Sequence, residues 1–304
     1  MKPVGFLCND IFFRHAPPPW HPDQPDRLVA IIDELKRSEL WEQLVHVTGR
    51  PAAFEDIARV HTPDHIAKVR SFGTGAIEDE TFMSELSLDA ALHAAGAVME
   101  ATDRIRQGEF RRAFCAVRPP GHHAEADKAV GFCIFNNVAV GARYAQCVGF
   151  RKIFIIDFDV HHGNGTQHIF ENDNSVFFFS THQAHLFPAT GMESERGHGE
   201  GAGFTYNVVM QAGSGNRDYL EVYEALLPPL MKRFFPDLVI VSAGYDIHAA
   251  DPLAAVRVSN EGVRAIISSI LSSTHAPIIF VLEGGYHLPS LAESVRITIR
   301  ELLK

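Results

Sequence analysis

One segment, Lys152–Thr166, constrains this chain more than any other. An apolar run, Lys152–Ile156, leads into two carboxylates, two imidazoles and a glycine-rich turn, KIFIIDFDVHHGNGT. Residues two apart in an extended segment share a face, so we expect Asp157, Asp159 and, if the extension persists, His161 to project together at the end of a buried strand. Oxygen and imidazole ligands crowded at one point are what a divalent metal ion requires.

Short apolar runs alternate with helical patterns along the chain, and no linker interrupts them. The predicted buried strands are Val4–Cys8, Ala113–Val117, Lys152–Ile156, Val176–Phe179, Leu238–Val241 and Pro277–Leu282. The predicted helices are Arg27–Arg37, an Ala-rich helix from an N-cap at Ser87 to about Arg106, Asn137–Val148, Asp218–Phe235, Glu261–Ser272 and Leu291–Leu303. This alternation predicts an α/β fold, a single domain over residues 1–304, with a mainly parallel sheet flanked by helices on both faces.

Polar motifs follow five of the predicted strands. They are Arg118–Cys133, Asp157–Thr166, Ser180–His182, Ser242–Pro252 and Glu283–His287. Ligands of such sheets bind in the loops at the carboxyl ends of the strands. Glycine and aspartate are ordinary turn residues, but histidine pairs and a Gly-Gly-Tyr are not. The pattern therefore predicts an active site at this edge of the sheet.

The side chains in these loops define a possible chemistry. Asp159, His161 and Asp246 would form a three-ligand site that leaves a position for water, the pattern of catalytic zinc. His122 and His123 are candidates for general acid–base catalysis, with Asp157 orienting one of the imidazoles. A histidine pair seen alone is also compatible with an ordinary surface loop.

Three aromatic residues are candidates for binding substrate. Tyr286 follows two glycines and is able to donate its hydroxyl to a developing oxyanion. Phe132 and Phe187 are candidates for the walls of a narrow channel. Core packing is the default for any one of 22 phenylalanines, and a lone tyrosine is more often a packing residue.

Composition argues against several classes of protein. The net charge of −10 disfavours nucleic acid as a main ligand. No apolar run approaches the roughly 20 residues of a membrane span, and the N-terminal segment does not resemble a signal peptide. Four cysteines without a CxxC pair are typical of reduced thiols, so we expect a cytoplasmic protein.

Together these motifs resemble the histone deacetylase family of the arginase–deacetylase fold, nearer to class II enzymes and their bacterial amidohydrolase relatives. RPPGHH, GFC, DFDVHHGNGT, SAGYD followed by DP, and LEGGY occur in the family's order between about His21 and Tyr286. This combination is highly specific and covers nearly the whole chain.

The resemblance implies a role for each matching residue. The implied zinc ligands are Asp159, His161 and Asp246; the tandem histidines are His122 and His123, with His123 as general base and acid; and the carbonyl-binding tyrosine is Tyr286. The implied tunnel walls are Phe132 and Phe187, with Arg27 near the acetate exit path. Asp157 and Ser180 match ligands of a structural potassium ion, and His162 matches a residue that is not a zinc ligand.

Two positions refine the resemblance. Asn164 stands where class I enzymes carry an aspartate beside the second tandem histidine, as it does in class II relatives. An amide stabilises an imidazolium less than a carboxylate does, so we expect a lower pKa for that histidine. Leu253 follows Asp251-Pro252, where one polyamine-preferring relative has glutamate, and leucine there favours acetyl-lysine.

We therefore expect a zinc-dependent deacetylase that converts acetyl-lysine in a peptide or protein, or a related acetylated amine, to acetate and free amine. The first alternative is an acetylpolyamine amidohydrolase, which the acidic run Glu78-Asp79-Glu80 favours if it faces the entrance. The others are a dinuclear-manganese ureohydrolase and a non-catalytic acyl-lysine binder. The former needs more bridging carboxylates, and the latter is expected to have lost Tyr286 or a metal ligand.

Overall fold

The structure, a computed structural model, describes residues 3–304. Met1 and Lys2 lie outside the described residues. They are the first residues of the predicted domain and of the N-terminal segment that was compared with a signal peptide. Eight parallel strands form one sheet in the order β2-β1-β5-β10-β9-β6-β7-β8. Their bounds are β1 Val4–Leu7, β2 Leu44–Val47, β5 Arg112–Cys115, β6 Ile153–Asp157, β7 Val176–Gln183, β8 Thr205–Met210, β9 Leu238–Ala243 and β10 Ile278–Leu282. A separate antiparallel hairpin joins β3 (Gly75–Glu78) to β4 (Thr81–Met83).

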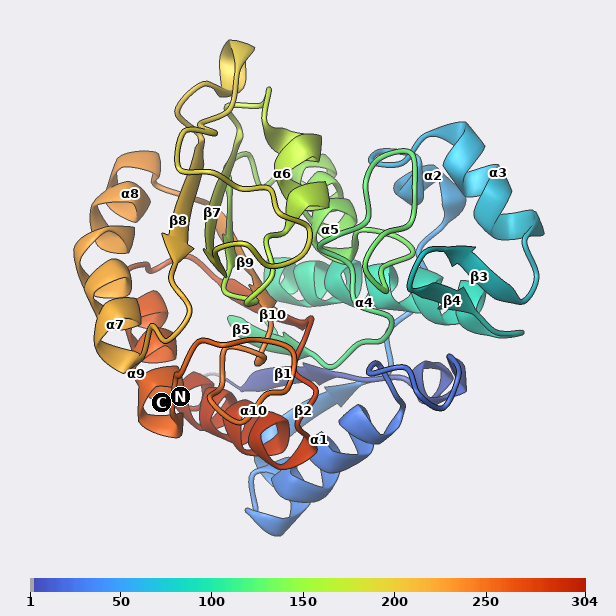
Figure 1. Cartoon of the computed structure of the whole chain (residues 1–304), viewed down its shortest axis with the longest axis horizontal. Helices are drawn as coiled ribbons and strands as arrows, with labels where there is room; N and C mark the ends of the chain where they lie inside the picture. Colours follow the sequence, from blue (N-terminus) through green and yellow to red (C-terminus); the bar gives the residue numbers. More distant parts are fainter. Residues whose placement is uncertain (1–2) are drawn as a thin grey trace.

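Helices cover both faces of the sheet (Figure 1). On one face lie α4 (Ser87–Gln107), α5 (Asn137–Cys147) and α6 (Asn164–Phe170); on the other lie α1 (Asp26–Arg37), α7 (Asn216–Ala225), α8 (Leu227–Phe234), α9 (Asn260–Ser272) and α10 (Leu288–Leu302). Shorter elements are α2 (Phe54–Ile57), α3 (Pro63–Ser71) and the 3-10 helices Asp10–Arg14, Trp41–Gln43 and Gly199–Gly201. The predicted single-domain α/β fold with a parallel sheet is thus confirmed.

Burial of the central strands explains why they were predictable from apolar runs in the sequence. Every residue of β6, β9 and β10 is buried, because helices cover both faces of these strands. The edge strands β2 and β8 contain half-buried and exposed residues, so neither presents a continuous apolar run. Both were absent from the predicted strands for this reason.

Three local predictions were wrong. The helix expected over Asp218–Phe235 is two helices, α7 and α8, because the consecutive prolines Pro228 and Pro229 lack N–H donors and their rings crowd the preceding turn. Ser87 is the first residue of α4 and not its cap: its hydroxyl accepts a hydrogen bond from the Ser84 N–H. Ser180–His182 is not a loop but the continuation of β7.

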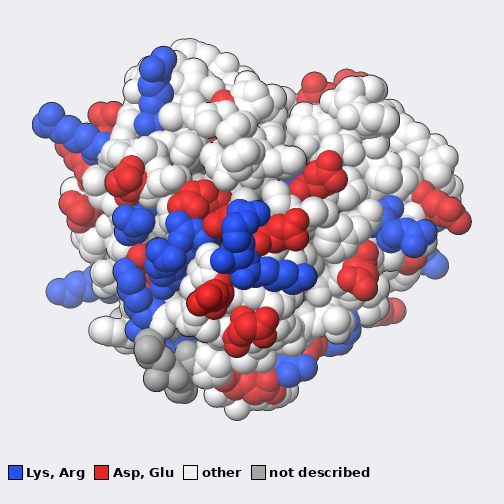
Figure 2. Space-filling model, turned by 90° about the horizontal axis from the view of Figure 1, so that it is seen from below, with Lys and Arg blue, Asp and Glu red and all other residues white. Residues whose placement is uncertain are grey.

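Acidic and basic side chains are interspersed on the face seen from below (Figure 2). Helices α1 and α10 pack together on that side of the molecule, and an ion pair of 3.2 Å joins Arg296 to Glu34. Among the helices of residues 3–304, none combines the length and the apolar character needed to cross a bilayer.

Candidate active site

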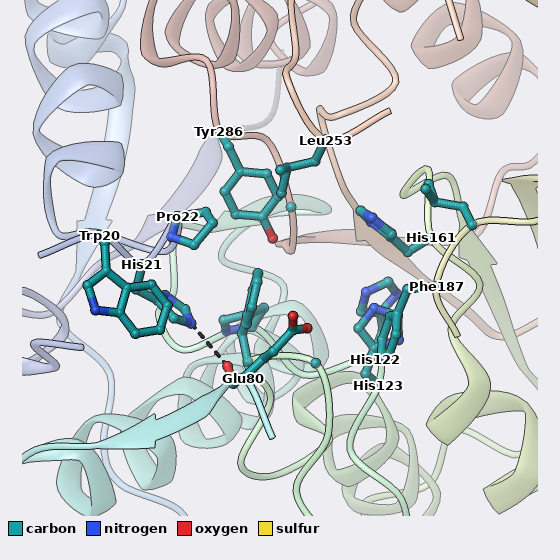
Figure 3. Close-up of a pocket in the computed structure, with 15 residues that line it drawn as sticks. Trp20, His21, Pro22, Glu80, His122, His123, His161, Phe187, Leu253 and Tyr286 are labelled. Atoms are coloured by element: carbon teal, nitrogen blue, oxygen red, sulfur yellow. Dashed lines mark hydrogen bonds between the residues drawn. The ribbon is translucent and has the colours of Figure 1, made fainter. Parts of the chain in front are cut away.

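A cavity of about 420 Å³ lies at the carboxyl ends of the central strands. Its lining comes from chain segments far apart in the sequence and includes His122, His123, His161 and Tyr286 (Figure 3). The strands β5, β10, β9 and β6 are neighbours in the sheet, so the loops that follow them meet at one edge. The predicted position of the site is therefore where the sheet brings these side chains together.

Asp159, His161 and Asp246 form a cluster in which one ligand atom of each residue lies within 4.8 Å of the others. His161 Nδ1 lies 3.0 Å from Asp159 Oδ1 and 3.2 Å from Asp246 Oδ2. Both carboxylates are buried, whereas the imidazole is partly exposed to the cavity. Two carboxylates and one imidazole are a donor set suited to zinc, with a position left open toward the cavity.

Backbone amides hold the two carboxylates in place. Asp159 accepts hydrogen bonds from the N–H groups of His161 (2.8 Å) and Gly284 (2.8 Å), and Asp246 Oδ1 accepts one from Val160 (3.0 Å). Asp246 Oδ2 is buried, and within residues 3–304 no donor is aligned to bond it. A buried oxygen without a hydrogen bond is costly, so this atom fits a metal ligand.

Gly284 keeps space beside the cluster. A Cβ atom at this position would lie 2.1 Å from Asp246 Oδ2 and 2.6 Å from Asp159 Oδ2. Any larger residue would displace the carboxylates, which explains the glycine in the LEGGY motif on steric grounds.

The Asp159–His161–Asp246 cluster favours a bound positive charge, as the pKa values of its residues show. Burial disfavours the charged form of His161, but the nearby carboxylates of Asp159 and Asp246 outweigh it and raise its pKa to about 10. Burial and the charge of Asp159 raise the pKa of Asp246. A proton and a metal cation would compete for the same three ligands, as expected of a metal site.

The tandem histidines have different partners. His122 Nδ1 lies 3.0 Å from Asp157 Oδ2, and His123 Nδ1 lies 2.7 Å from Asn164 Oδ1. Asp157 therefore orients an imidazole and does not belong to the Asp159–His161–Asp246 cluster. Strand β6 ends at Asp157, so the alternation of side chains that applies in a strand stops there.

The environments move the two histidine pKa values in opposite directions. Burial opposes protonation of His122, but Asp157, Asp159 and Glu283 outweigh it and raise its pKa to about 10. Burial, followed by the charge of His122, holds the pKa of His123 well below its ordinary value. A lowered pKa of His123 was expected because its partner, Asn164, is an amide and not a carboxylate. Burial, however, is the main cause of the lowering.

Glu283 supports the tandem-histidine loop and was not singled out from the sequence. Its Oε2 accepts hydrogen bonds from the N–H groups of Gly121 (2.7 Å) and His122 (3.2 Å), and its Oε1 accepts one from the Ser242 hydroxyl (3.1 Å). The carboxyl is completely buried, and burial raises its pKa to about 7. A charged residue at the end of an apolar strand, in VLEGGY, was the available signal.

The aromatic candidates lie in the cavity wall. Phe187 packs edge-on against His123 with 5.1 Å between ring centroids, and Phe132 packs in the same way against Tyr286 at 6.0 Å. Gly131 lets these rings approach, because a Cβ there would lie 2.6 Å from the His123 ring and 2.9 Å from Phe187. The structure thus brings all three predicted aromatic residues to one cavity, with the Tyr286 hydroxyl pointing into it (Figure 3).

The mouth of the cavity contains residues of mixed character. Leu253 lines it, as do Trp20, His21 and Glu80. Trp20 is 70% exposed. The backbone carbonyl of Glu80 accepts a hydrogen bond from His21 Nε2 (3.1 Å), and its carboxylate extends toward the cavity (Figure 3). Trp20 and His21 were not predicted to line the cavity, because the sequence of a loop does not show where the loop packs.

Three other predicted residues lie behind the cavity. Arg27 is buried beneath Tyr286, with its guanidinium carbon 4.9 Å from the ring centroid and its Nε donating to Gly285 O (2.8 Å). Asp157 and Ser180 are opposite each other in the register of β6 and β7. Both already have protein partners: Asp157 Oδ1 accepts from the Asp159 N–H, and Ser180 Oγ lies 2.9 Å from His182 Nδ1. His162 contacts Thr190 and Gln167 and does not join the metal cluster.

Comparisons with known proteins agree with this geometry. The family model described as "Histone deacetylase domain" matches residues 21–302. Histone deacetylase 5 of Arabidopsis thaliana is 35% identical over 325 residues, covering 100% of this chain and 49% of that protein. Polyamine deacetylase HDAC10 of Homo sapiens is 37% identical over 298 residues, covering 92% of this chain and 44% of that protein.

A solved structure, the HDA15 HD domain, matches with a TM-score of 0.94 and 33% identity, covering 99% of this chain and 88% of that one. The chain spans about half the length of several curated relatives that it matches. The matched domain, the shared fold and the clustered motifs lead to one conclusion: this chain belongs to the histone deacetylase family.

Proposed function

We propose that this protein is a zinc-dependent deacetylase acting on acetylated lysine side chains. One observation carries the proposal: the Asp159–His161–Asp246 cluster lies at the floor of a cavity lined by Phe132, Phe187, the tandem histidines and Tyr286. A cavity with aromatic walls and a metal-ligand cluster at its floor fits an extended acyl-lysine side chain.

The three ligands would hold one zinc ion at this floor. When bound, zinc would supply Lewis-acid polarisation of the acyl carbonyl and would lower the pKa of a bound water molecule. The fit rests on the donor set, on the unbonded Asp246 Oδ2 and on the space that Gly284 leaves.

His123 would act as general base and then as general acid. Its Nδ1–H donates to Asn164 Oδ1, so its Nε2 lone pair is free for a proton. In the first step Nε2 takes a proton from the attacking water as the new C–O bond forms. In the second, Nε2 returns that proton to the amine nitrogen as the C–N bond breaks, leaving acetate and free amine.

Two neighbouring groups would stabilise the negative charge that develops on the acyl oxygen. The Tyr286 hydroxyl, held among Arg27, Phe132 and the Gly284-Gly285 turn, would donate a hydrogen bond to it. Asp157 favours the protonated form of His122, which would then add a positive charge close by.

Turnover and metal content together test this proposal. The purified protein should contain zinc, lose activity on chelation, regain it on zinc addition, and release acetate from an acetyl-lysine peptide. Zinc-loaded protein that releases no acetate from acetyl-lysine or acetylated amines would overturn it.

A structural potassium ion near Asp157 and Ser180 is part of the same proposal. The motive is that Asp157 and Asp159 are two buried carboxylates close together, and the single imidazole of His122 is shared between them. A crystal grown in potassium that shows only water near these residues would count against it.

An acetylpolyamine amidohydrolase is the second candidate, and Glu80 is the observation that favours it. Glu80 lines the mouth together with the exposed indole of Trp20, and both groups attract cations. Leu253, which offers nothing to an ammonium group, lines the same cavity and favours acetyl-lysine. Values of kcat/KM for an acetyl-lysine peptide and N8-acetylspermidine decide between them, and a polyamine preference of tenfold or more would promote the second candidate.

A further inference from the structure

A continuous row of hydrogen bonds leads from the cavity floor to the surface. His123 Nδ1 lies 2.7 Å from Asn164 Oδ1, and Asn164 Nδ2 donates to Glu125 Oε1. The two carboxylate oxygens of Glu125 lie 3.0 and 3.1 Å from His168 Nδ1. Glu125 is thus the link between a buried histidine and a half-exposed one.

Two hydrogen bonds fix the backbone of Glu125. Its N–H donates to Lys128 O (3.0 Å), and its carbonyl accepts from His61 Nδ1 (2.9 Å). The side chain is 14% exposed, so it is largely covered and is not a freely moving surface acid.

The donor and acceptor types of these groups determine how the amide of Asn164 lies. A carboxylate accepts hydrogen bonds and donates none, so Asn164 must turn its NH₂ group toward Glu125. The His123 backbone carbonyl, a second and longer acceptor at 3.3 Å, favours the same orientation. The amide oxygen is left facing His123 Nδ1, which must therefore carry the hydrogen, and the Nε2 lone pair faces the cavity.

We propose that Glu125 is a positioning residue for the reaction: by orienting the Asn164 amide, it selects the tautomer of His123 that is able to act as a base. This inference rests on the proposed function, because it assigns Glu125 a role through His123. The simpler interpretation is that Glu125 only pairs with His168 at the surface, and it predicts no link to catalysis.

Glu125→Gln is the first test, since glutamine is nearly the same size but offers both a donor and an acceptor. The Asn164 amide is then free to turn, and a fraction of the molecules carries His123 as the wrong tautomer. We expect kcat to fall about tenfold with little change in KM, as for other residues that orient a catalytic group.

Glu171→Gln is the matched control. Glu171 pairs with His198 at 3.2 Å on the surface, so its loss removes the same charge from a similar pair without touching Asn164. We expect kcat within twofold of wild type. An equal loss of kcat in both variants would overturn the proposal in favour of a general effect of surface charge.

A second substitution should reverse the sign of the effect. In Asn164→Asp, two carboxylates face each other at positions 125 and 164, and a glutamine at position 125 would relieve the repulsion by donating to the new carboxylate. Glu125→Gln should therefore lower kcat in the wild-type background and raise it in the Asn164→Asp background. A loss in both backgrounds would contradict the proposal.

The nitrogen-15 shifts of the His123 ring in zinc-loaded protein give a readout that needs no substrate. We expect Nδ1 to be the protonated nitrogen in the wild type, and a mixture of tautomers in Glu125→Gln. Identical shifts in the two proteins would overturn the proposal for Glu125. Failure of the proposed function would appear separately, as a wild-type protein with the expected tautomer and no turnover.

Discussion

The floor and the mouth of the cavity are built in opposite ways. At the floor, Asp159, His161 and Asp246 are buried or nearly so, and backbone amides hold both carboxylates. At the mouth, Trp20 is 70% exposed and Phe187 is 43% exposed; Trp20 packs against the Phe82 ring and Phe187 against the His123 ring. Substitutions at the floor should therefore alter the chemistry, whereas substitutions at the mouth should alter the choice of substrate.

The difference follows from where the two regions lie on the sheet. Floor residues directly follow β6, β9 and β10, adjacent strands in the sheet. Most mouth residues come from the segment before α1, from the β3–β4 hairpin and from the loop after β7; Leu253 comes from the loop after β9, further along than Asp246. Strand ends are rigid and loops adapt, so the floor is the more constrained region.

The largest effect is expected from Asp246→Ala at the floor. The substitution removes one of three ligands, and we expect both zinc binding and turnover to be lost. Zinc per chain after dialysis and kcat on an acetyl-lysine peptide measure the two losses. The control is Asp64→Ala, an exposed acid on α3. Wild-type zinc content in Asp246→Ala would sink the ligand assignment.

The next largest effect is expected in the ion cluster that anchors the mouth segment to the floor. Asp23 is fully buried and lies 2.8 Å from both Arg27 and Arg118. Asp23→Asn leaves two buried guanidinium groups without their counter-charge and should lower the free energy of unfolding by about 3–5 kcal/mol. Urea titrations of wild type and variant measure it, and a change below 1 kcal/mol would contradict the role of the cluster.

The same cluster gives a signed pH dependence. Burial disfavours the Asp23 carboxylate, but Arg118 and Arg27 outweigh it and hold its pKa below the ordinary value. A depressed folded-state pKa stabilises the protein above the unfolded-state pKa of about 3.9, and this contribution is lost as the pH falls through the folded-state value. Wild type should thus lose stability relative to Asp23→Asn only below about pH 4.

Tyr286→Phe tests the floor without removing a ligand. Loss of one oxyanion donor should lower kcat by roughly 10²–10³ while zinc content stays unchanged. His123→Ala should likewise retain zinc and lose most activity. Unchanged rates in both variants of a chelation-sensitive enzyme would refute the proposed roles of the two residues.

The smallest effect is expected at the mouth. Glu80→Gln should lower kcat/KM for N8-acetylspermidine about fivefold, since a partly screened carboxylate attracts an ammonium group by about 1 kcal/mol. Asp79→Asn, an exposed neighbour outside the cavity lining, is the control. Equal effects of the two substitutions would mean that overall charge, and not the mouth, attracts the substrate.

Much of the floor was predictable from residues alone. Asp159, His161 and Asp246 follow apolar runs, and a parallel sheet brings the ends of its strands to one edge. The supporting contacts were not predictable. Glu283 reaches the tandem-histidine loop, and Glu125 reaches Asn164, across 39 or more positions of sequence. Such pairs depend on how helices and loops pack, about which local periodicity carries no information.

The sequence by itself determined the fold class and the chemistry available at each strand end, because buried parallel strands read as apolar runs with polar termini. Only the tertiary structure decided which way each side chain turns. Asp157 faces His122 and not the metal ligands because β6 ends there, and the β3–β4 hairpin turns Glu80 toward the cavity. Side chains alternate between the two faces of a strand only while the backbone stays extended. Beyond the strand ends, contacts distant in sequence set the direction.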